Sequence, residues 1–351
     1  MIEGGSEELI RIRRRTLRRY ALAALAALLL LVASFFVSLV TGPVGISLYD
    51  AIMMMFGIGD ETQVYIIREI RVPRILCCAL VGAALSISGL AMQGLFRNPM
   101  ASPSVLGVSS GAAFGASLAM AFGLGAAFGS FAVPAMAFIL CFGTTFLVYL
   151  LARTGGGVSV TMLLLSGIAV GAFFNGMVSA IQYLADGQTL QSIVYWLMGS
   201  FASCGWDSFT LALVPILLGI ALIALNSSEL NMLSLGEEQA ESLGVNVRLT
   251  RMLLLTGTSL AVAGSVSISG IIGFVGLIIP HIFRMIVGPN HRILSLLSVV
   301  GGAAFMILMD SVARSVISPD DLPIGILTAL LGAPFFIYVM RTRRSYRMGA
   351  E

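Results

Sequence analysis

The longest uncharged stretches of this chain decide what it can fold into. Residues 20–40 form a run of 21 without Asp, Glu, Lys or Arg, and residues 98–152 form a run of 55. A helix of about 20 apolar residues crosses the ~30 Å hydrocarbon core of a bilayer. The chain has only 11% charged residues, whereas a soluble domain has about 25%. The sequence therefore predicts an all-α polytopic membrane protein.

Charged residues, Gly and Pro divide the apolar sequence into ten predicted spans. They are residues 20–40, 75–96, two spans within 98–152 that part at 123–134, 154–185, 208–228, two spans within 252–283 that part at 264–276, 293–309 and 322–340. The polar connections are too short to fold alone. We expect an Arg-rich N-terminal tail (1–19), one transmembrane domain (20–341) with a polar loop at about 229–251, and a C-terminal tail (342–351).

The arginines predict the orientation of these spans. Ten spans place both termini on one side of the membrane. With the termini in the cytoplasm, 16 of the 20 arginines lie inside, and only Arg68, Arg71, Arg74 and Arg314 lie outside. This bias agrees with the positive-inside rule, so we expect cytoplasmic termini.

Composition also excludes several kinds of chemistry. The chain contains no Lys, which rules out a phosphate-binding loop of the Walker A type and a Schiff-base enzyme. Its four cysteines lack zinc-ligand spacing, and we interpret them as small apolar residues: Cys77, Cys78, Cys141 and Cys204. We expect no metal, no cofactor and no nucleic-acid partner.

Ionisable residues within the spans are few. Asp310 is the clearest, and Arg314 follows four residues later, a spacing that allows an ion pair on one helix. An ion-coupled carrier requires acids or unwound helix ends near the midplane. Their scarcity disfavours an ion-coupled secondary transporter of a small molecule, which remains the alternative function.

The arginines on the predicted outer side have two interpretations. Arg71 and Arg74 flank Val72 and Pro73 at the outer end of a span, and Arg314 lies on the same side. Such side chains can extend to lipid headgroups. They can also dock an acidic extracytoplasmic protein, where charge pairs set orientation and encounter rate.

The inner loop predicts a short amphipathic helix. Ser234 can cap it with Glu237 at the third helical position, and Gly244 can end it. Glu237, Glu238 and Glu241 disfavour an anionic lipid surface. A cytoplasmic protein is therefore the favoured partner.

Small residues recur at intervals of four within two spans. They form the series Gly107, Gly111 and Gly115 and the pair Gly167 and Gly171. This spacing is typical of membrane helices that pack closely.

A hydrolase has weak support. Residues 107–111 fit the Gly-x-Ser-x-Gly pattern around Ser109, and His281 lies downstream. However, the pattern follows Pro103 into an apolar helix, and no acid accompanies His281 to orient it as a base. We favour packing at a helix end for His281.

Several blocks, in order along the chain, resemble the FecCD family. They are Arg-Val-Pro-Arg at 71–74, Gly-Ala-Ala-Leu-Ser-Ile-Ser-Gly-Leu-Ala-Met-Gln at 82–93, Arg-Asn-Pro-Met-Ala-Ser-Pro at 97–103, Leu-Gly-Val-Ser-Ser-Gly at 106–111, Leu-Gly-Glu at 235–237, Gly-Phe-Val-Gly-Leu-Ile-Ile-Pro-His-Ile-Phe-Arg at 273–284, and Leu-Pro-Ile-Gly at 322–325 with Leu-Gly-Ala-Pro at 331–334. The resemblance covers roughly residues 20–340.

The resemblance implies a permease subunit of a binding-protein-dependent ABC importer in a prokaryotic cytoplasmic membrane. It would pair with a second copy of itself, two cytoplasmic ATP-binding subunits and an extracytoplasmic binding protein, and would not itself be an enzyme. The cargo would be an iron-siderophore, haem or cobalamin, and the residues do not choose among them.

The resemblance also assigns roles to residues. Docking of the binding protein falls on Arg71, Arg74 and Arg314. Coupling to the ATPase falls on Ser234, Leu235, Gly236, Glu237, Glu238, Glu241 and Gly244. The inner gate falls on Asn98, Pro99, Met100, Ser159 and Val160.

Overall fold

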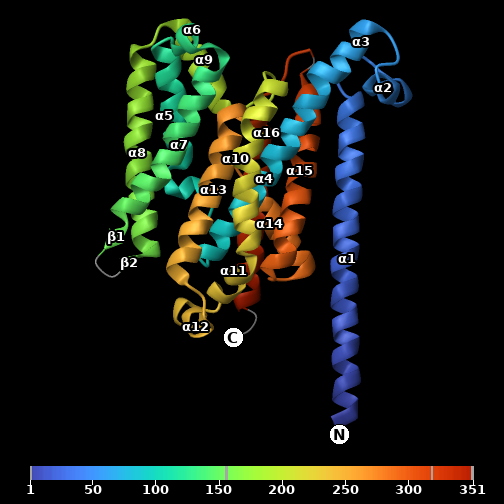
Figure 1. Cartoon of the computed structure of the whole chain (residues 1–351), viewed down its shortest axis with the longest axis vertical. Helices are drawn as coiled ribbons and strands as arrows, with labels where there is room; N and C mark the ends of the chain where they lie inside the picture. Colours follow the sequence, from blue (N-terminus) through green and yellow to red (C-terminus); the bar gives the residue numbers. More distant parts are fainter. Residues whose placement is uncertain (1, 155–156, 318, 349–351) are drawn as a thin grey trace.

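The computed structural model describes residues 2–154, 157–317 and 319–348, and it is almost entirely helical (Figure 1). The helices are α1 (Ile2–Val40), α2 (Leu48–Met55), α3 (Glu61–Tyr65), α4 (Val72–Leu95), α5 (Val108–Ala121), α6 (Leu124–Phe128), α7 (Ala132–Leu151), α8 (Val160–Leu184), α9 (Gly187–Met198), α10 (Trp206–Leu225), α11 (Ser227–Leu233), α12 (Glu237–Ser242), α13 (Val247–Ser269), α14 (Val275–Val287), α15 (His291–Val316) and α16 (Ile324–Met348).

Short irregular elements connect these helices. A π-helical turn (Ile66–Arg71) joins α3 to α4, and 3-10 turns occupy Pro103–Leu106 and Gly129–Phe131. The strands β1 (Arg153–Thr154) and β2 (Gly157–Val158) pair antiparallel between α7 and α8.

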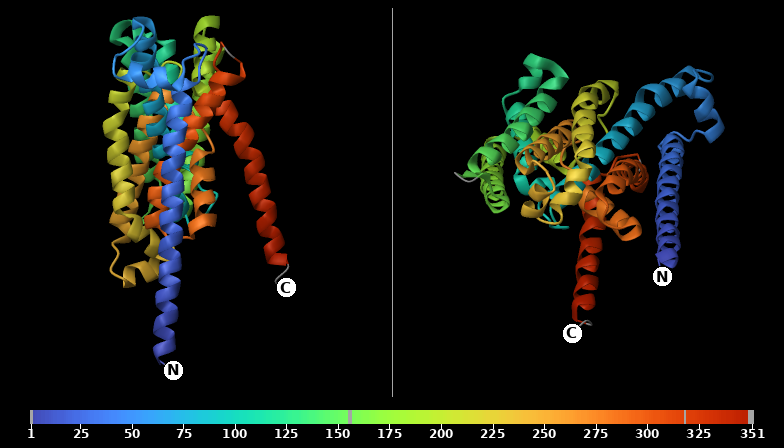
Figure 2. Two further views of the ribbon diagram at one scale, coloured as in Figure 1. Left: turned by 90° about the vertical axis from the view of Figure 1, so that its right-hand side faces the viewer. Right: turned by 60° about the horizontal axis from the view of Figure 1, so that its bottom comes forward.

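The helices confirm the predicted polytopic membrane architecture. Within the described ranges, seven helical segments are long and apolar enough to cross a membrane, and three shorter apolar helices lie in α5, α14 and α16. Together they match the ten predicted spans. Both ends of the chain lie at the same end of the molecule (Figures 1 and 2), as an even number of crossings requires.

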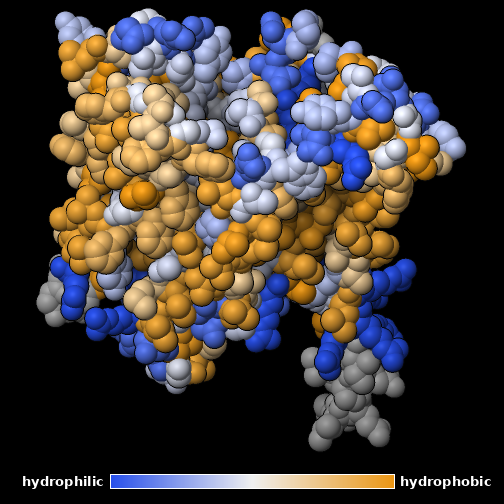
Figure 3. All heavy atoms as spheres, turned by 45° about the horizontal axis from the view of Figure 1, so that its top comes forward, coloured by the Kyte–Doolittle hydropathy of each residue, from blue (hydrophilic) through white to orange (hydrophobic). Residues whose placement is uncertain are grey.

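The outer surface of the molecule is apolar across its middle. Figure 3 shows hydrophobic side chains covering the helices between hydrophilic residues at the two ends. Large exposed side chains such as Leu29 on α1, Phe173 on α8 and Leu217 on α10 belong to this surface. In water such a surface would be far larger than the apolar patches of soluble monomers, and in a bilayer it faces lipid tails.

Helix α4 forms the centre of the bundle and packs against α10, α13, α14 and α15. Close approach of backbones makes this packing possible. A Cβ at Gly82 would overlap the backbone of Gly302 on α15, and one at Gly89 would overlap the backbone of Gly276 on α14. Small residues allow such contacts, and dispersion between the closely spaced backbones then holds the helices together.

The predicted glycine series lie at a second set of contacts. A Cβ at Gly111 or Gly115 would overlap α7, and one at Gly167 would overlap Val105 and Leu106. Gly107 has φ +72°, a left-handed conformation that suits glycine. Gly171 is less crowded, because an added Cβ would lie 3.5 Å from the Cα of Gly107.

Three features add detail to the sequence expectations. The described residues of both predicted tails are helical, because α1 begins at Ile2 and α16 continues to Met348, while residues 349–351 lie outside the described chain. Helix α9, between the fifth and sixth spans, was not predicted. The break predicted at 264–276 is confirmed but narrower, since α13 runs to Ser269 and α14 begins at Val275.

We predict that Gly89→Ala strongly destabilises the protein. The added methyl group meets backbone atoms of Gly276 that cannot rotate away, and overpacking of this kind costs about 1–3 kcal/mol or more. Thermal unfolding and folded yield in detergent would measure the effect. The matched control is Gly143→Ala on α7, where an added Cβ has nothing within 4 Å. The control should be neutral or stabilising by up to about 1 kcal/mol, and equal losses in both variants would contradict the packing argument.

Candidate functional site

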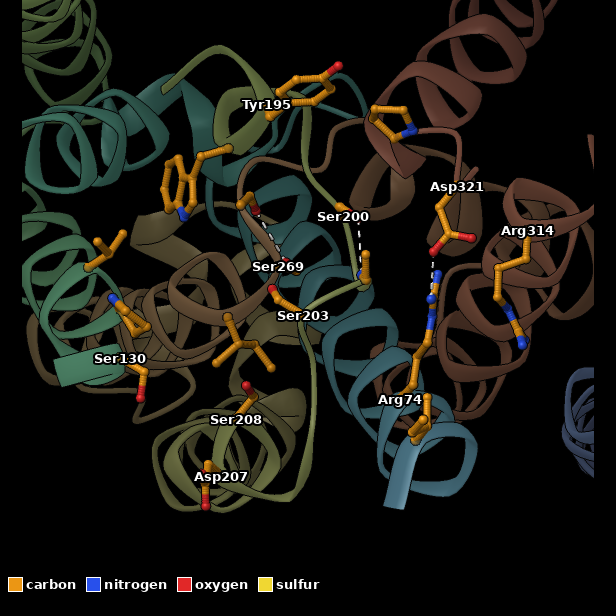
Figure 4. Close-up of a pocket in the computed structure, with 18 of the residues that line it drawn as sticks. Arg74, Ser130, Tyr195, Ser200, Ser203, Asp207, Ser208, Ser269, Arg314 and Asp321 are labelled. Carbon is orange, nitrogen blue, oxygen red and sulfur yellow. Dashed lines mark hydrogen bonds and ion pairs between the residues drawn. The ribbon is translucent and has the colours of Figure 1, made fainter. Parts of the chain in front are cut away.

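A large cavity opens at the end of the molecule opposite the termini. Its volume is about 1170 Å³. It is lined by the ends of α4, α10, α13 and α15, by α9, and by the loops that join them. Seven serines contribute hydroxyl groups to its wall: Ser130, Ser192, Ser200, Ser203, Ser208, Ser267 and Ser269. Figure 4 shows labelled serines on one side of this cavity and Arg74, Arg314 and Asp321 on the other.

The charges that line the cavity balance formally. Arg71, Arg74 and Arg314 contribute three positive charges, and three negative charges come from Asp207, Asp320 and Asp321. The cavity therefore offers hydroxyls and mixed charges without a strong net field for ions of one sign.

Backbone hydrogen bonds join the elements that form the cavity floor. Ser200 donates its N–H to the carbonyl of Ser269 at 2.8 Å, and Ile324 donates to the carbonyl of Gly199 at 3.0 Å. These two bonds connect the segment after α9 to the end of α13 and the start of α16. The other end of α9 is capped by Asp186, whose carboxylate accepts from the N–H groups of Thr189 and Gln188, and these bonds lower the pKa of Asp186.

A buried cluster of charges lies at the edge of the cavity. Arg74 donates through Nη2 to Asp310 Oδ1 at 2.8 Å and through Nη1 to Asp321 Oδ2 at 2.7 Å. Arg314 Nε lies 3.0 Å from Asp310 Oδ2, so the ion pair expected between these two residues is confirmed. Asp310 thus pairs with two guanidinium groups, Asp321 supplies a second negative charge, and the cluster joins α4, α15 and the loop before α16.

Two arginines also bind carbonyl groups in the last turn of α1 and in the loop that follows it. Arg71 donates to the carbonyls of Leu39 at 2.7 Å and Val44 at 2.7 Å, and Arg314 donates to that of Thr41 at 2.8 Å. The last carbonyls of a helix lack partners within the helix and carry partial negative charge. The two cations therefore fasten α1 to the bundle.

These contacts enclose the three arginines that the sequence analysis assigned to docking. Arg71, Arg74 and Arg314 are only 4, 9 and 6% exposed. Their guanidinium groups already bind groups of this chain, although all three line the cavity. Of the four arginines predicted on this side, Arg68 is the exposed one.

The predicted coupling loop forms two short helices at the opposite end, α11 and α12 (Figure 1). The expected cap is wrong: Ser234 ends α11 and donates to the carbonyl of Asn231 at 2.6 Å. Gly236, with φ +132°, is the N-cap of α12, and Glu237 is its first residue. Gly244, with φ +86°, follows α12 and ends the helix as expected.

Part of the coupling loop is exposed. Leu235 and Leu243 are large exposed apolar side chains on either side of α12, and Glu238 and Glu241 are exposed acidic side chains. Apolar groups flanked by acids form a surface that suits a protein rather than an anionic leaflet.

The predicted gate residues lie in two separate turns. Asn98, Pro99 and Met100 follow α4, where Asn98 Oδ1 accepts from the N–H of Met100 at 2.9 Å. Ser159 is the N-cap residue of α8 and Val160 its first residue, directly after the β1–β2 hairpin. Among the residues that the structure describes, no hydrogen bond or ion pair joins the two turns.

Sequence reasoning missed Arg251, which contacts the coupling loop directly. Arg251 on α13 donates through Nη2 to Glu237 Oε1 at 2.6 Å and through Nη1 to the carbonyl of Val158. A single Arg at a helix start carries no signal that would reveal partners 14 and 93 residues away.

The features of a hydrolase are not assembled. Ser109 lies in the first turn of α5 after a 3-10 turn, and its Oγ is 3.3 Å from that of Ser104. The ring of His281 packs edge-on against Phe335, with centroids 6.2 Å apart. All four cysteines are free and buried.

Comparison with known proteins identifies the family. The sequence profile of the FecCD transport family matches residues 29–342, and the chain belongs to this family. It is 43% identical over 287 residues to the molybdate import system permease protein MolB of Haemophilus influenzae, a match that covers 81% of this chain and 84% of that protein. It is 41% identical over 337 residues to the cobalamin import system permease protein BtuC of Halobacterium salinarum, covering 93% and 89%.

A solved structure agrees with the sequence relatives. An inward-facing structure of a metal-chelate type ABC transporter superimposes with a TM-score of 0.82 and 40% identity, over 91% of this chain and 98% of that chain. The resemblance found in the sequence is therefore confirmed over nearly the whole length.

We predict that Asp310→Ala lowers the free energy of unfolding by about 3–5 kcal/mol, because it leaves Arg74 and Arg314 buried without their shared counter-charge. Asp321→Ala is the matched control. Asp321 is 25% exposed and binds Arg74 through Nη1 alone, so its loss should cost less than about 1 kcal/mol. Thermal unfolding in detergent compares the two variants. Equal stability of both variants would show that the cluster does not hold the fold.

Proposed function

We propose that this chain is the membrane permease subunit of an ATP-driven importer in the cytoplasmic membrane of a prokaryote. The observation that carries this proposal is the match to an ABC transporter structure over 91% of the chain at a TM-score of 0.82. The chain has no Lys for a nucleotide-binding loop. ATP hydrolysis therefore belongs to separate partner subunits, and this chain provides the passage.

The exposed part of the coupling loop supports a cytoplasmic ATPase partner. Helix α12, which carries Glu238 and Glu241 and is flanked by Leu235 and Leu243, projects beyond the ends of α10 and α13 (Figure 1). A motor subunit that seats α12 in a groove would bury the two leucines and pair with the acids. Two such subunits would serve two copies of the permease.

The exposed faces of α8 and α16 support pairing with a second copy. Large apolar side chains such as Ile168 and Phe173 on α8, and Leu330 and Ile337 on α16, are exposed in the single chain. Lipid can cover such faces, but a second copy placed against them would also enclose a passage between two bundles. Gating residues at Asn98, Pro99, Met100, Ser159 and Val160 remain part of this proposal.

The cargo belongs to a broader class than iron chelates. The two relatives named above import molybdate and cobalamin, according to their names, and they differ greatly in size. Among the described residues, no group of three or more His, Cys, Asp or Glu could hold a metal ion. A cavity of serines and balanced charges suits polar cargo in general, so cargo selection falls to the binding protein.

We predict that uptake requires all the partners. Proteoliposomes should contain this chain with its ATPase subunits, and the binding protein and labelled molybdate, cobalamin, haem or ferric siderophore should be added outside. Uptake of one cargo should require both ATP and the binding protein. The control vesicles contain the chain alone with a proton or sodium gradient. Uptake by the control vesicles would support a secondary transporter and overturn the proposal.

The binding protein is proposed to dock beside Arg71, Arg74 and Arg314. Because internal contacts occupy these three guanidinium groups, the exposed Arg68 offers the cleanest test of charge-guided docking. Arg68→Glu should weaken association of the binding protein a few-fold, and more strongly at low ionic strength.

The docking measurement is binding of the purified binding protein to the complete transporter in nanodiscs at two salt concentrations. Glu61→Gln, an exposed change on the same side, should strengthen association slightly or leave it unchanged. Unchanged binding by the Arg68 variant at both salt concentrations would remove charge-guided docking from the proposal.

A further inference from the structure

Arg251 joins three elements at the predicted cytoplasmic end of the bundle. It lies in the second turn of α13 and is only 7% exposed. One arm of its guanidinium binds the carboxylate of Glu237 at the start of α12, and the other arm binds the carbonyl of Val158 at the end of β2. Its Nε has no hydrogen-bond partner. Its position is therefore set by these two groups.

The two partners of Arg251 belong to regions with different proposed roles. The side chain of Glu237 is 42% exposed, so a subunit that engages α12 can reach it. Val158 precedes Ser159 and Val160, where α8 begins. The guanidinium group of Arg251 thus lies between α12, where the ATPase is proposed to bind, and the residues at the start of α8 that are proposed to close the passage.

The sparse packing of α8 allows the contact with Arg251 to influence where this helix begins. Only 28% of the most apolar part of α8 is buried, against 78% for α13, which carries Arg251. Within the single chain, α13 is therefore held by more packing than α8, and α8 has fewer contacts with this chain's own helices to resist a shift at its first turn. The planar fork of Arg can hold a carboxylate and a carbonyl at the same time, whereas Lys offers only a point charge.

We propose that Arg251 is the positioning residue that transmits engagement of α12 by the ATPase to the start of α8. A motor group that binds Glu237 draws the carboxylate from Arg251, and the buried cation then shifts its remaining contact with the Val158 carbonyl. The start of α8 follows, and the inner end of the passage changes its opening. This inference rests on the proposed function, because it requires an ATPase at α12.

The test measures movement at the start of α8 without needing to know the cargo. In a background with the native cysteines replaced, Ser159→Cys would be labelled by a membrane-impermeant maleimide in the complete transporter. Labelling rates would be compared without nucleotide and after trapping with ATP and vanadate. A coupling free energy of typical size changes the ratio of these rates about fivefold or more.

Arg251→Gln should bring this labelling ratio close to one, because the link between α12 and the carbonyl of Val158 is lost. Arg251→Lys should also bring the labelling ratio close to one, because Lys keeps the positive charge but lacks the planar guanidinium that binds two groups at once. The matched control is Arg248→Gln, an exposed Arg three residues earlier on α13, and it should keep the wild-type ratio. An unchanged ratio in Arg251→Gln would overturn the inference.

A charge-swapped double variant separates coupling from folding. Glu237→Arg combined with Arg251→Glu restores the ion pair, but a Glu at 251 cannot donate to the carbonyl of Val158. This variant should recover thermal stability lost by Arg251→Glu alone and still lack the nucleotide-dependent change in labelling. Recovery of both would show that only the ion pair matters and would overturn the role of Val158. If the wild-type transporter itself showed neither ATPase binding nor a labelling change, the proposed function would fail together with the inference.

Discussion

A bilayer offers no hydrogen-bond partners to the backbone and no hydrophobic force that drives one membrane helix onto another. This constraint explains why the centre of the protein depends on glycine. Helix α4 approaches α15 at Gly82 and Gly302, and α14 at Gly89 and Gly276, so closely that no side chain fits between them. Dispersion between backbones then replaces the hydrophobic effect that assembles soluble cores.

The same constraint decides where charged side chains lie. The buried arginines described above occupy the two ends of the bundle, and each bridges at least two elements. Arg74 joins α4 to α15 through Asp310, whereas Arg71 binds mainly the carbonyl groups around the end of α1. For Arg71 the partial negative charge of a helix C-terminus takes the place of a carboxylate. The interactions that compensate the charge of these arginines are thus the same ones that hold the helices together.

The sequence predicted the spans because membrane thickness fixes their length and because charged residues, Gly and Pro interrupt them. It predicted the pair of Asp310 and Arg314 because four residues span one helical turn. It could not predict that Arg74 shares Asp310, since the two residues are separated by 236 positions and meet only after the helices have packed. Helix α9 was missed because the sequence was searched for membrane spans, and its 12 residues are too few to cross a membrane. The cap expected at Ser234 was wrong because Gly236 adopts a conformation that begins the helix two residues later.

Uneven packing gives this bundle a fixed part and a part that can shift. In the segment Glu61–Leu95, which ends with α4, 89% of the most apolar part is buried, whereas the value for α8 is 28%. Helix α8 begins at the hairpin near the coupling loop and leads, through Asp186, into α9, which lines the outer cavity. A movement that starts at the inner end of α8 reaches the cavity only across the break at Ala185 and Asp186, where the chain continues into α9. Two positions of α8 against the well-packed helices around α4 can differ in free energy by only a few kcal/mol. Binding of partners at either end of the protein is able to reverse such a difference.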